Sequence, residues 1–222
     1  MRRIICCLVT IGLTLTGLQA QEIAKSGKSR WGAGIFAGLN YTYPRVVIHY
    51  PAHFSPQTNL LLGVDLNYQL TARVLLHAQP SWTQIRNVSP NGFSRSLILN
   101  STTVSIPLFY RYFVLPAHRS LFVEAGISYN RIVKSDYRED SGVVCITGPC
   151  PTVYTPKVSA STKSAVSGLA GVGVNIELHK ISVPVTLRYE RYVSSYMFPG
   201  FYERSSTPVQ FENFSITTGV NF

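Results

Sequence analysis

Residues 211–222 read FENFSITTGVNF, and their side chains alternate in character from one position to the next. In an extended strand, successive side chains point to opposite faces. One face of this strand is mostly apolar and carries Phe214, Ile216, Thr218, Val220 and Phe222. The other face is small and neutral and carries Asn213, Ser215, Thr217, Gly219 and Asn221. A small neutral face suits a narrow interior and an apolar face suits lipid, as in the closing strand of an outer-membrane β-barrel.

Seven earlier segments show the same period of two. They cover about residues 31–43, 60–70, 73–86, 97–114, 121–133, 166–178 and 181–190. The connections between them alternate long and short, which is the pattern of outer-membrane barrels with short periplasmic turns and long outer loops. The sequence therefore predicts an all-β fold, an eight-stranded antiparallel up-and-down transmembrane β-barrel. Both termini are expected in the periplasm and the long loops outside the cell.

A soluble lipocalin-like barrel would also have eight alternating strands, with its apolar face inside. It would need a charged exterior, but lysine is nearly absent from these strands and their polar face is Ser, Gly, Asn and Thr. The membrane barrel is therefore favoured. Pro80, Pro107 and Pro184 remove ladder donors, so we expect bulges or strand ends at those points.

The first twenty residues have the pattern of a secretory signal peptide. Arg2 and Arg3 are followed by an apolar run over residues 4–18 and by Leu-Gln-Ala at residues 18–20. The alternative is an uncleaved anchor, for which the run is short. We expect a signal peptide at residues 1–20, a short periplasmic lead-in at 21–30 and a barrel domain at 31–222.

The chain is basic, with 20 Lys and Arg against 10 Asp and Glu among its 222 residues. The charges are scattered over many connections and form no basic helix or stripe, so nucleic acid is not expected as a partner. The anions that fit an exported barrel are the phosphates of outer-membrane lipid and lipopolysaccharide. The closing strand is expected to engage the barrel assembly machinery.

Ile106-Pro107-Leu108 and Tyr110-Arg111-Tyr112 resemble a mid-chain strand of the PorT-like outer-membrane β-barrel family, with Phe109 where a second Leu is usual. The resemblance extends over about residues 31–222 through the same eight-strand rhythm and terminal Phe. It implies a bacterial outer-membrane barrel. It also implies, for some members, a role in a secretion apparatus, and so an envelope or secretion protein as a partner.

The inward face collects the ionisable residues of the strands. They are Asp65, Arg73, His77, Arg111, Glu124, Glu177, Arg188 and Glu190. Unpaired charges are costly in a low-dielectric interior, so opposite charges should pair and cross-link the wall. The alternative is a proton or ion path, but eight strands leave a bore that side chains can fill.

Cys145 and Cys150 flank a Gly-Pro turn in a long exported loop, and a local disulfide is favoured over free thiols. His49 and His53 share an earlier loop and are read as solvated histidines, because no Ser or Asp partner stands at a recognisable spacing. No catalytic, cofactor or metal site is predicted. We expect a non-enzymatic barrel that binds at the cell surface or supports an envelope or secretion assembly. The alternatives are a small outer-membrane enzyme acting on lipid or peptide, or a narrow channel.

Overall fold

The computed structural model describes residues 30–46, 57–91, 95–114, 120–141, 153–154, 159–178, 181–199 and 206–222. Its strands are β1 (Trp31–Val46), β2 (Gln57–Gln69), β3 (Val74–Ala78), β4 (Ser81–Asn91), β5 (Arg95–Phe113), β6 (Leu121–Ser141), β7 (Val153–Tyr154), β8 (Ser164–Leu178), β9 (Ile181–Tyr192), β10 (Tyr196–Pro199) and β11 (Ser206–Asn221). No helix in this described part is long and apolar enough to cross a membrane.

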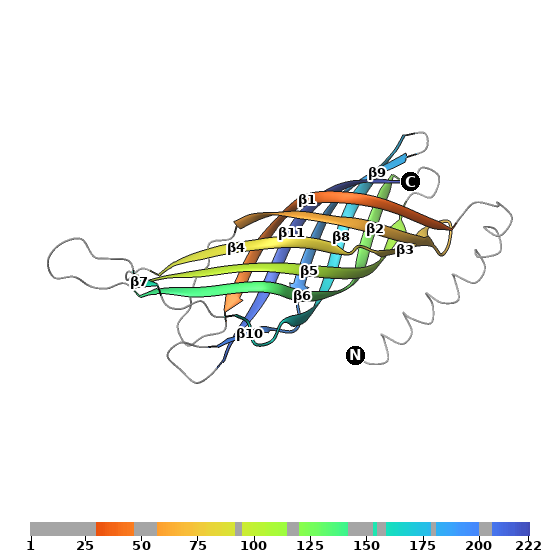
Figure 1. Cartoon of the computed structure of the whole chain (residues 1–222). Coiled ribbons are helices and arrows are strands. Elements are labelled where there is room, and N and C mark those ends of the chain that lie inside the picture. The colour runs from red at the N-terminus through yellow and green to blue at the C-terminus, as the bar shows by residue number, and fades with distance from the viewer. Residues whose placement is uncertain are drawn as a thin grey trace.

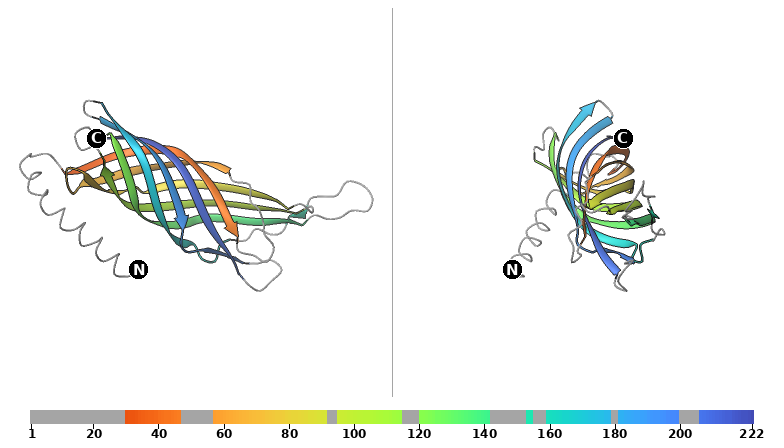
Figure 2. Two further views of the ribbon diagram at one scale, coloured as in Figure 1. Left: turned by 180° about the vertical axis from the view of Figure 1, so that it is seen from behind. Right: turned by 90° about the vertical axis from the view of Figure 1, so that its left-hand side faces the viewer.

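The long strands close into one antiparallel ring (Figure 1 and Figure 2). Going round it, the neighbours are β1, β2, the β3–β4 pair, β5, β6, β8, β9 and β11. The ring closes between the first and last strands, from Gly34 opposite Asn221 to Val46 opposite Val209. With β3 and β4 counted as one interrupted strand, the ring has eight members. The predicted fold class is confirmed.

The interruption between β3 and β4 lies at Pro80, where the sequence predicts a strand end. The ring stays hydrogen-bonded there, because the Pro80 carbonyl accepts from the Val64 amide at 3.0 Å and the Gln79 amide donates to the Pro107 carbonyl at 3.1 Å. Pro107 and Pro184 do not end their strands, because they lie inside β5 and β9 in register with β6 and β8. A proline removes only its own donor, so a ladder continues through it when the flanking residues supply the bonds. The ladder between β9 and β11 nevertheless has no pair at Val183 and Pro184.

The two faces of the barrel wall are sorted as the alternation predicts. Large apolar side chains are exposed on the outside, as Ile35, Ile127 and Ile216 illustrate. Polar and ionisable side chains are buried on the inside, among them Asp65 and Glu124. A barrel of this kind has an apolar band facing lipid and a polar interior.

The two ends of the barrel differ in the connections between their strands. At the terminal end, the Phe222 amide donates to the Ala33 carbonyl at 2.9 Å, and short connections join β2 to β3, β5 to β6 and β8 to β9. The connections from β1 to β2, from β6 to β8 and from β9 to β11 are longer and lie at the opposite, long-connection end, where β4 and β5 are joined by residues 92–94 alone. There β10 extends the line of β9, because both pair with β11. β6 reaches Ser141 instead of the expected 133, and it also pairs with β7 (Figure 1).

Phenylalanines fill the interior beside glycines. Three inward phenylalanines each lie opposite a glycine of the adjacent strand, in the pairs Phe36 with Gly63, Phe109 with Gly126 and Phe122 with Gly173. A Cβ at any of these glycines would meet atoms of the facing phenylalanine. The glycines therefore give aromatic rings room to lie across the wall of a narrow bore, as expected for close packing.

Candidate functional site

The strongest charge cluster of the interior is centred on Glu124 of β6. Arg111 is its register partner on β5 and donates through Nε at 2.9 Å and Nη2 at 2.6 Å to Glu124 Oε1. Arg188 of β9 donates through Nη2 to Glu124 Oε2 at 2.8 Å. All three residues are buried. One carboxylate thus joins two guanidinium groups from separate strands, which ties β5, β6 and β9 together across the bore.

Aromatic rings and an amide complete the surroundings of these two arginines. The Arg111 guanidinium carbon lies 4.1 Å from the centroid of the Phe122 ring, and that of Arg188 lies 4.5 Å from the Phe109 ring. Arg188 Nη2 also donates to Gln79 Oε1 at 3.0 Å. Cations over aromatic faces are stabilised by the ring quadrupole, and more so when water is excluded. The cluster has two cations and one anion, and the rings help to hold the excess positive charge.

Asp65 and His77 form a second buried pair beside this cluster. The Asp65 Oδ1 to His77 Nδ1 distance is 2.8 Å, and both side chains are almost fully enclosed. The His77 ring stacks on Phe109, with centroids 5.1 Å apart and planes 3° from parallel. Phe109 therefore lies between His77 and Arg188 and connects the two clusters. We call Asp65, His77, Arg111, Glu124 and Arg188 the ion-paired layer.

The other three predicted residues lie outside this layer. Glu190 accepts hydrogen bonds from neutral donors: Ser167, Asn130 at 3.2 Å and Asn213 at 3.0 Å. Arg73 lies partly exposed in the turn before β3, and Glu177 is exposed near the terminal end of β8. Neither forms an ion pair with any residue that the structure describes. The expectation that all eight would pair is therefore wrong for these three.

An apolar cluster fills the interior at the long-connection end, and we call it the aromatic layer. Its members are Leu99, Ile132, Ala160, Ala165, Tyr192, Tyr196, Phe198, Val209 and Phe211. Tyr192, Tyr196 and Phe211 form its centre, with ring centroids 5.6–5.7 Å apart. The alternation did not predict this layer, because β10 and residues 159–162 lie outside the expected strands. The sequence did contain one signal for the layer. Counted in twos along their strands, Tyr192 falls on the same inward face as Glu190, and Phe211 on the same inward face as Asn213.

A small cavity lies in the interior between the two layers. It holds about 30 Å³ and lies beside Arg188, Glu190, Tyr192 and Asn213. That volume accommodates about one or two water molecules. The polar atoms around it are therefore suited to hydrogen-bonding trapped water rather than to passing hydrated ions.

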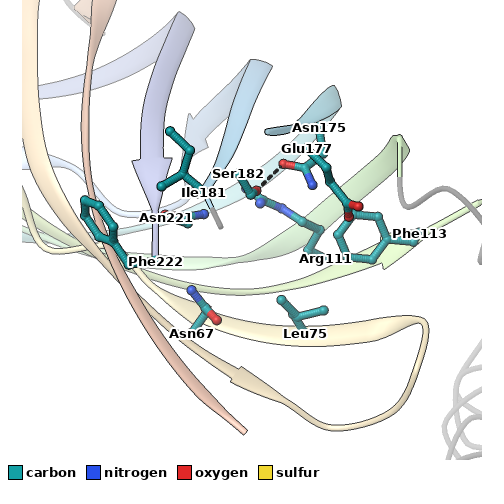
Figure 3. Close-up of a pocket in the computed structure, with 10 residues that line it drawn as sticks. All are labelled: Asn67, Leu75, Arg111, Phe113, Asn175, Glu177, Ile181, Ser182, Asn221 and Phe222. Carbon is teal, nitrogen blue, oxygen red and sulfur yellow. Dashed lines mark hydrogen bonds between the residues drawn. The ribbon is translucent and has the colours of Figure 1, made fainter. Parts of the chain in front are cut away.

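A larger cavity of about 250 Å³ opens at the terminal end (Figure 3). Figure 3 shows the amides of Asn67, Asn175 and Asn221 around the same opening as Arg111. Ser182 donates to Asn175 Oδ1 at 2.6 Å across its rim. Because Arg111 also belongs to the ion-paired layer, that layer forms the floor of the cavity. The polar lining is suited to holding water.

Several predicted residues cannot be placed. Cys145, Cys150, His49 and His53 all lie outside the described residues, so the disulfide stays a prediction. Within the described ranges, no three His, Cys, Asp or Glu side chains come together as a metal site would need.

The fold and the filled interior define a small, closed barrel of the outer-membrane type, and a solved structure shows the same architecture. The chain is similar to the outer membrane protein OprG from Pseudomonas aeruginosa, with a TM-score of 0.50 and 10% sequence identity over 88% of this chain and 97% of that one. It is also similar to Ail, the attachment invasion locus protein of Yersinia pestis, with a TM-score of 0.44 and 10% identity over 86% and 98% of the two chains. No family model and no curated protein matches its sequence.

Proposed function

We propose that this protein is a non-enzymatic β-barrel of the bacterial outer membrane that works through its long connections at the cell surface. The observation that carries the proposal is the pair of layers that fill the bore. The ion-paired layer and the aromatic layer occupy the interior, and the cavity between them holds about 30 Å³. With the interior filled, the surfaces that remain for binding are the ends of the barrel and its outer wall.

The proposed orientation follows from the lengths of the connections. The terminal end faces the periplasm, and the long-connection end faces outward, as in other barrels with short inner turns. Residues 1–20 act as a cleaved signal peptide and residues 21–30 as the lead-in. Cys145 and Cys150 form a disulfide in the longest outer loop, where the oxidising surroundings favour it.

The proposal also includes partners and a family. Membership of the PorT-like family rests on Ile106-Pro107-Leu108 and Tyr110-Arg111-Tyr112. Under this membership, the outer surface of the barrel would support an envelope or secretion assembly. The closing strand, β11, is proposed to engage the barrel assembly machinery, and outer-membrane lipid and lipopolysaccharide surround the folded barrel.

Two measurements test the proposal. The mature protein should be recovered in the outer-membrane fraction and shift on gels when heated, and in planar bilayers it should carry no large, steady current. Recovery as a soluble periplasmic monomer would overturn the membrane barrel. A steady ionic conductance from the wild-type protein would overturn the filled interior and favour the channel.

A further inference from the structure

The outer wall changes from mainly apolar to mainly polar along β4, β5 and β6. Trp82 lies opposite Val104, and Ile106 lies opposite Tyr129, so these side chains form apolar rows on the outside, with Arg131 next to Val104 on β6. Aromatic residues of this kind mark the boundary between the acyl chains and the headgroups. The next rows toward the long-connection end are polar. On β4 and β5 they carry Gln84, Arg86, Asn100 and Thr102.

A β-bulge in β6 adds a cation to these rows. Thr102 of β5 pairs with Lys134, but the adjacent Thr103 pairs with Ile132, so Val133 is an extra residue. Val133 and Lys134 are both exposed, whereas Ser135 is buried. Under unbroken alternation Lys134 would point into the barrel. The bulge instead turns it outward, a re-aiming that bulges commonly achieve.

These side chains surround a cavity on the outside of the wall. It holds about 360 Å³ and is lined by Gln84, Arg86, Asn100, Ser101, Thr102, Lys134 and Asp136. The ladder aligns Gln84, Thr102 and Lys134 in one row and Arg86, Asn100 and Asp136 in the next. A guanidinium, an ammonium, two amides and a hydroxyl therefore converge on one hollow. Such a donor set suits phosphate oxygens, and the amide oxygens of Gln84 and Asn100 suit a sugar hydroxyl.

One more cation is exposed on the wall beside the cavity, Arg131 of β6, which lies opposite Val104. Arg45 and Arg191 are also exposed, but they lie on β1 and β9, which flank β11 on the other side of the ring. Glu212 lies near both of these arginines, 3.0 Å from Arg45 and 3.7 Å from Arg191. The Asp136 carboxylate lines the cavity together with Arg86 and Lys134, and Arg131 adds a third cation beside it. The cavity thus lies in a net positive zone directly above an apolar wall.

We propose that this cavity binds the phosphate and adjoining sugar of a phosphorylated glycolipid in the outer leaflet, of the lipopolysaccharide type. The inference rests on the proposed outer-membrane location and deepens it by naming a site. Arg86 and Lys134 bind the phosphate, Gln84, Asn100 and Thr102 hydrogen-bond the headgroup, and the acyl chains lie along Trp82 and Val104. The apolar wall distinguishes this ligand from a free phosphate, because only an amphiphile contacts both zones.

The test measures how much lipid A binds to the purified full-length protein in detergent, by titration followed with native mass spectrometry. The double variant R86A/K134A should bind at least about tenfold more weakly than wild type, because two charge-assisted contacts are lost. The matched control R30A/R73A removes two arginines near the terminal end and should bind as wild type does. K134R keeps the charge and should retain most of the affinity.

Two further arms identify the source of the phosphate. Lipid A stripped of its phosphates should bind as weakly to wild type as intact lipid A binds to R86A/K134A. Inorganic pyrophosphate should compete only at much higher concentration than lipid A. Equal binding of lipid A by wild type and R86A/K134A would refute the proposed site. Competition by pyrophosphate at concentrations similar to those of lipid A would refute a lipid as the ligand.

A separate readout distinguishes failure of the site from failure of the proposed function. Heat modifiability on gels reports the folded barrel for each variant. A folded, outer-membrane-located wild type that binds no lipid A would refute the site alone. A wild type that never enters the outer membrane would refute the proposed function as well.

Discussion

The interior of this barrel is filled in two different ways at its two ends. The ion-paired layer is made by residues of the ring itself, and its central pair, Arg111 and Glu124, are register partners on adjacent strands. The aromatic layer also uses pieces outside the ring, Tyr196 and Phe198 of β10 and Ala160 of the segment before β8. The first layer depends on charge compensation and the second on packing. An eight-stranded bore can therefore be filled by either kind of chemistry. Mutations in the two layers should destabilise the barrel for different physical reasons.

The largest expected effect is in the ion-paired layer. Glu124→Gln should lower the free energy of unfolding by about 3–5 kcal/mol, because it leaves two buried guanidinium groups without their carboxylate. Arg188→Ala should cost less, since Glu124 keeps Arg111 as a partner. Urea unfolding in lipid vesicles measures both. Glu177→Gln is the matched control and should change stability by less than about 0.5 kcal/mol, as an exposed site should.

The aromatic layer should respond to loss of volume. Phe211→Ala removes a fully buried ring that contacts Tyr192 and Tyr196, and should cost about 3 kcal/mol. Phe211→Leu keeps most of the volume and should cost about 1 kcal/mol. The same unfolding assay, repeated in high salt, separates the layers further. A strong salt dependence of the Phe211→Ala effect would contradict a layer held by packing.

Glycines test the packing of the aromatic rings inside the bore. Gly173→Ala should cost about 1–3 kcal/mol, since the new Cβ would lie 2.6 Å from the Phe122 ring at Cε2. Gly168→Ala, on the same strand, meets nothing within 4 Å and should be neutral or slightly stabilising. Thermal unfolding of the two variants gives the comparison. Equal destabilisation would mean that the strand backbone, not the ring, sets the cost.

The smallest effect is expected outside both layers. Arg45→Ala breaks the 3.0 Å pair with Glu212, in which the arginine side chain is about half exposed. Exposed ion pairs contribute little, so the cost should stay below about 1 kcal/mol and vanish in high salt. Unfolding at low and high ionic strength measures it. A cost as large as that of Glu124→Gln would remove the distinction between buried and exposed pairs.

The alternation along the strands was enough to predict the ring, its two faces and the centre of the ion-paired layer. Asp65, His77, Arg111, Glu124 and Arg188 share one face by parity alone, and the barrel geometry brings that face together. The alternation shows which face of a strand a side chain lies on, but not how far along the bore it lies. Arg73 and Glu177 share the inward face by alternation but lie near the terminal end, where water replaces a partner.

The aromatic layer and the outer cavity could not be predicted from the alternation, for another reason. Beyond the apolar band the pattern is inverted, because on β11 Val209 and Phe211 are buried in the aromatic layer whereas Gln210 and Glu212 lie on the outer face. A bulge also reverses the parity, and the reversal at Val133 puts Lys134 on the face opposite to the one that counting in twos assigns. Tertiary pairing, not local pattern, sets both features.

The pairing of β1 with β11 has a consequence for the order of folding. Gly34 lies opposite Asn221, so the last hydrogen bonds of the ring join the two ends of the chain. Contacts between such remote segments are slow to form, because the entropy of closing the loop is lost before they stabilise anything. Until the 16 residues of β11 arrive, β1 and β9 each present an open edge that could pair with another chain. Before β11 pairs, the edges of β1 and β9 must both be protected from other chains. The pairing of β11 covers both edges in one step.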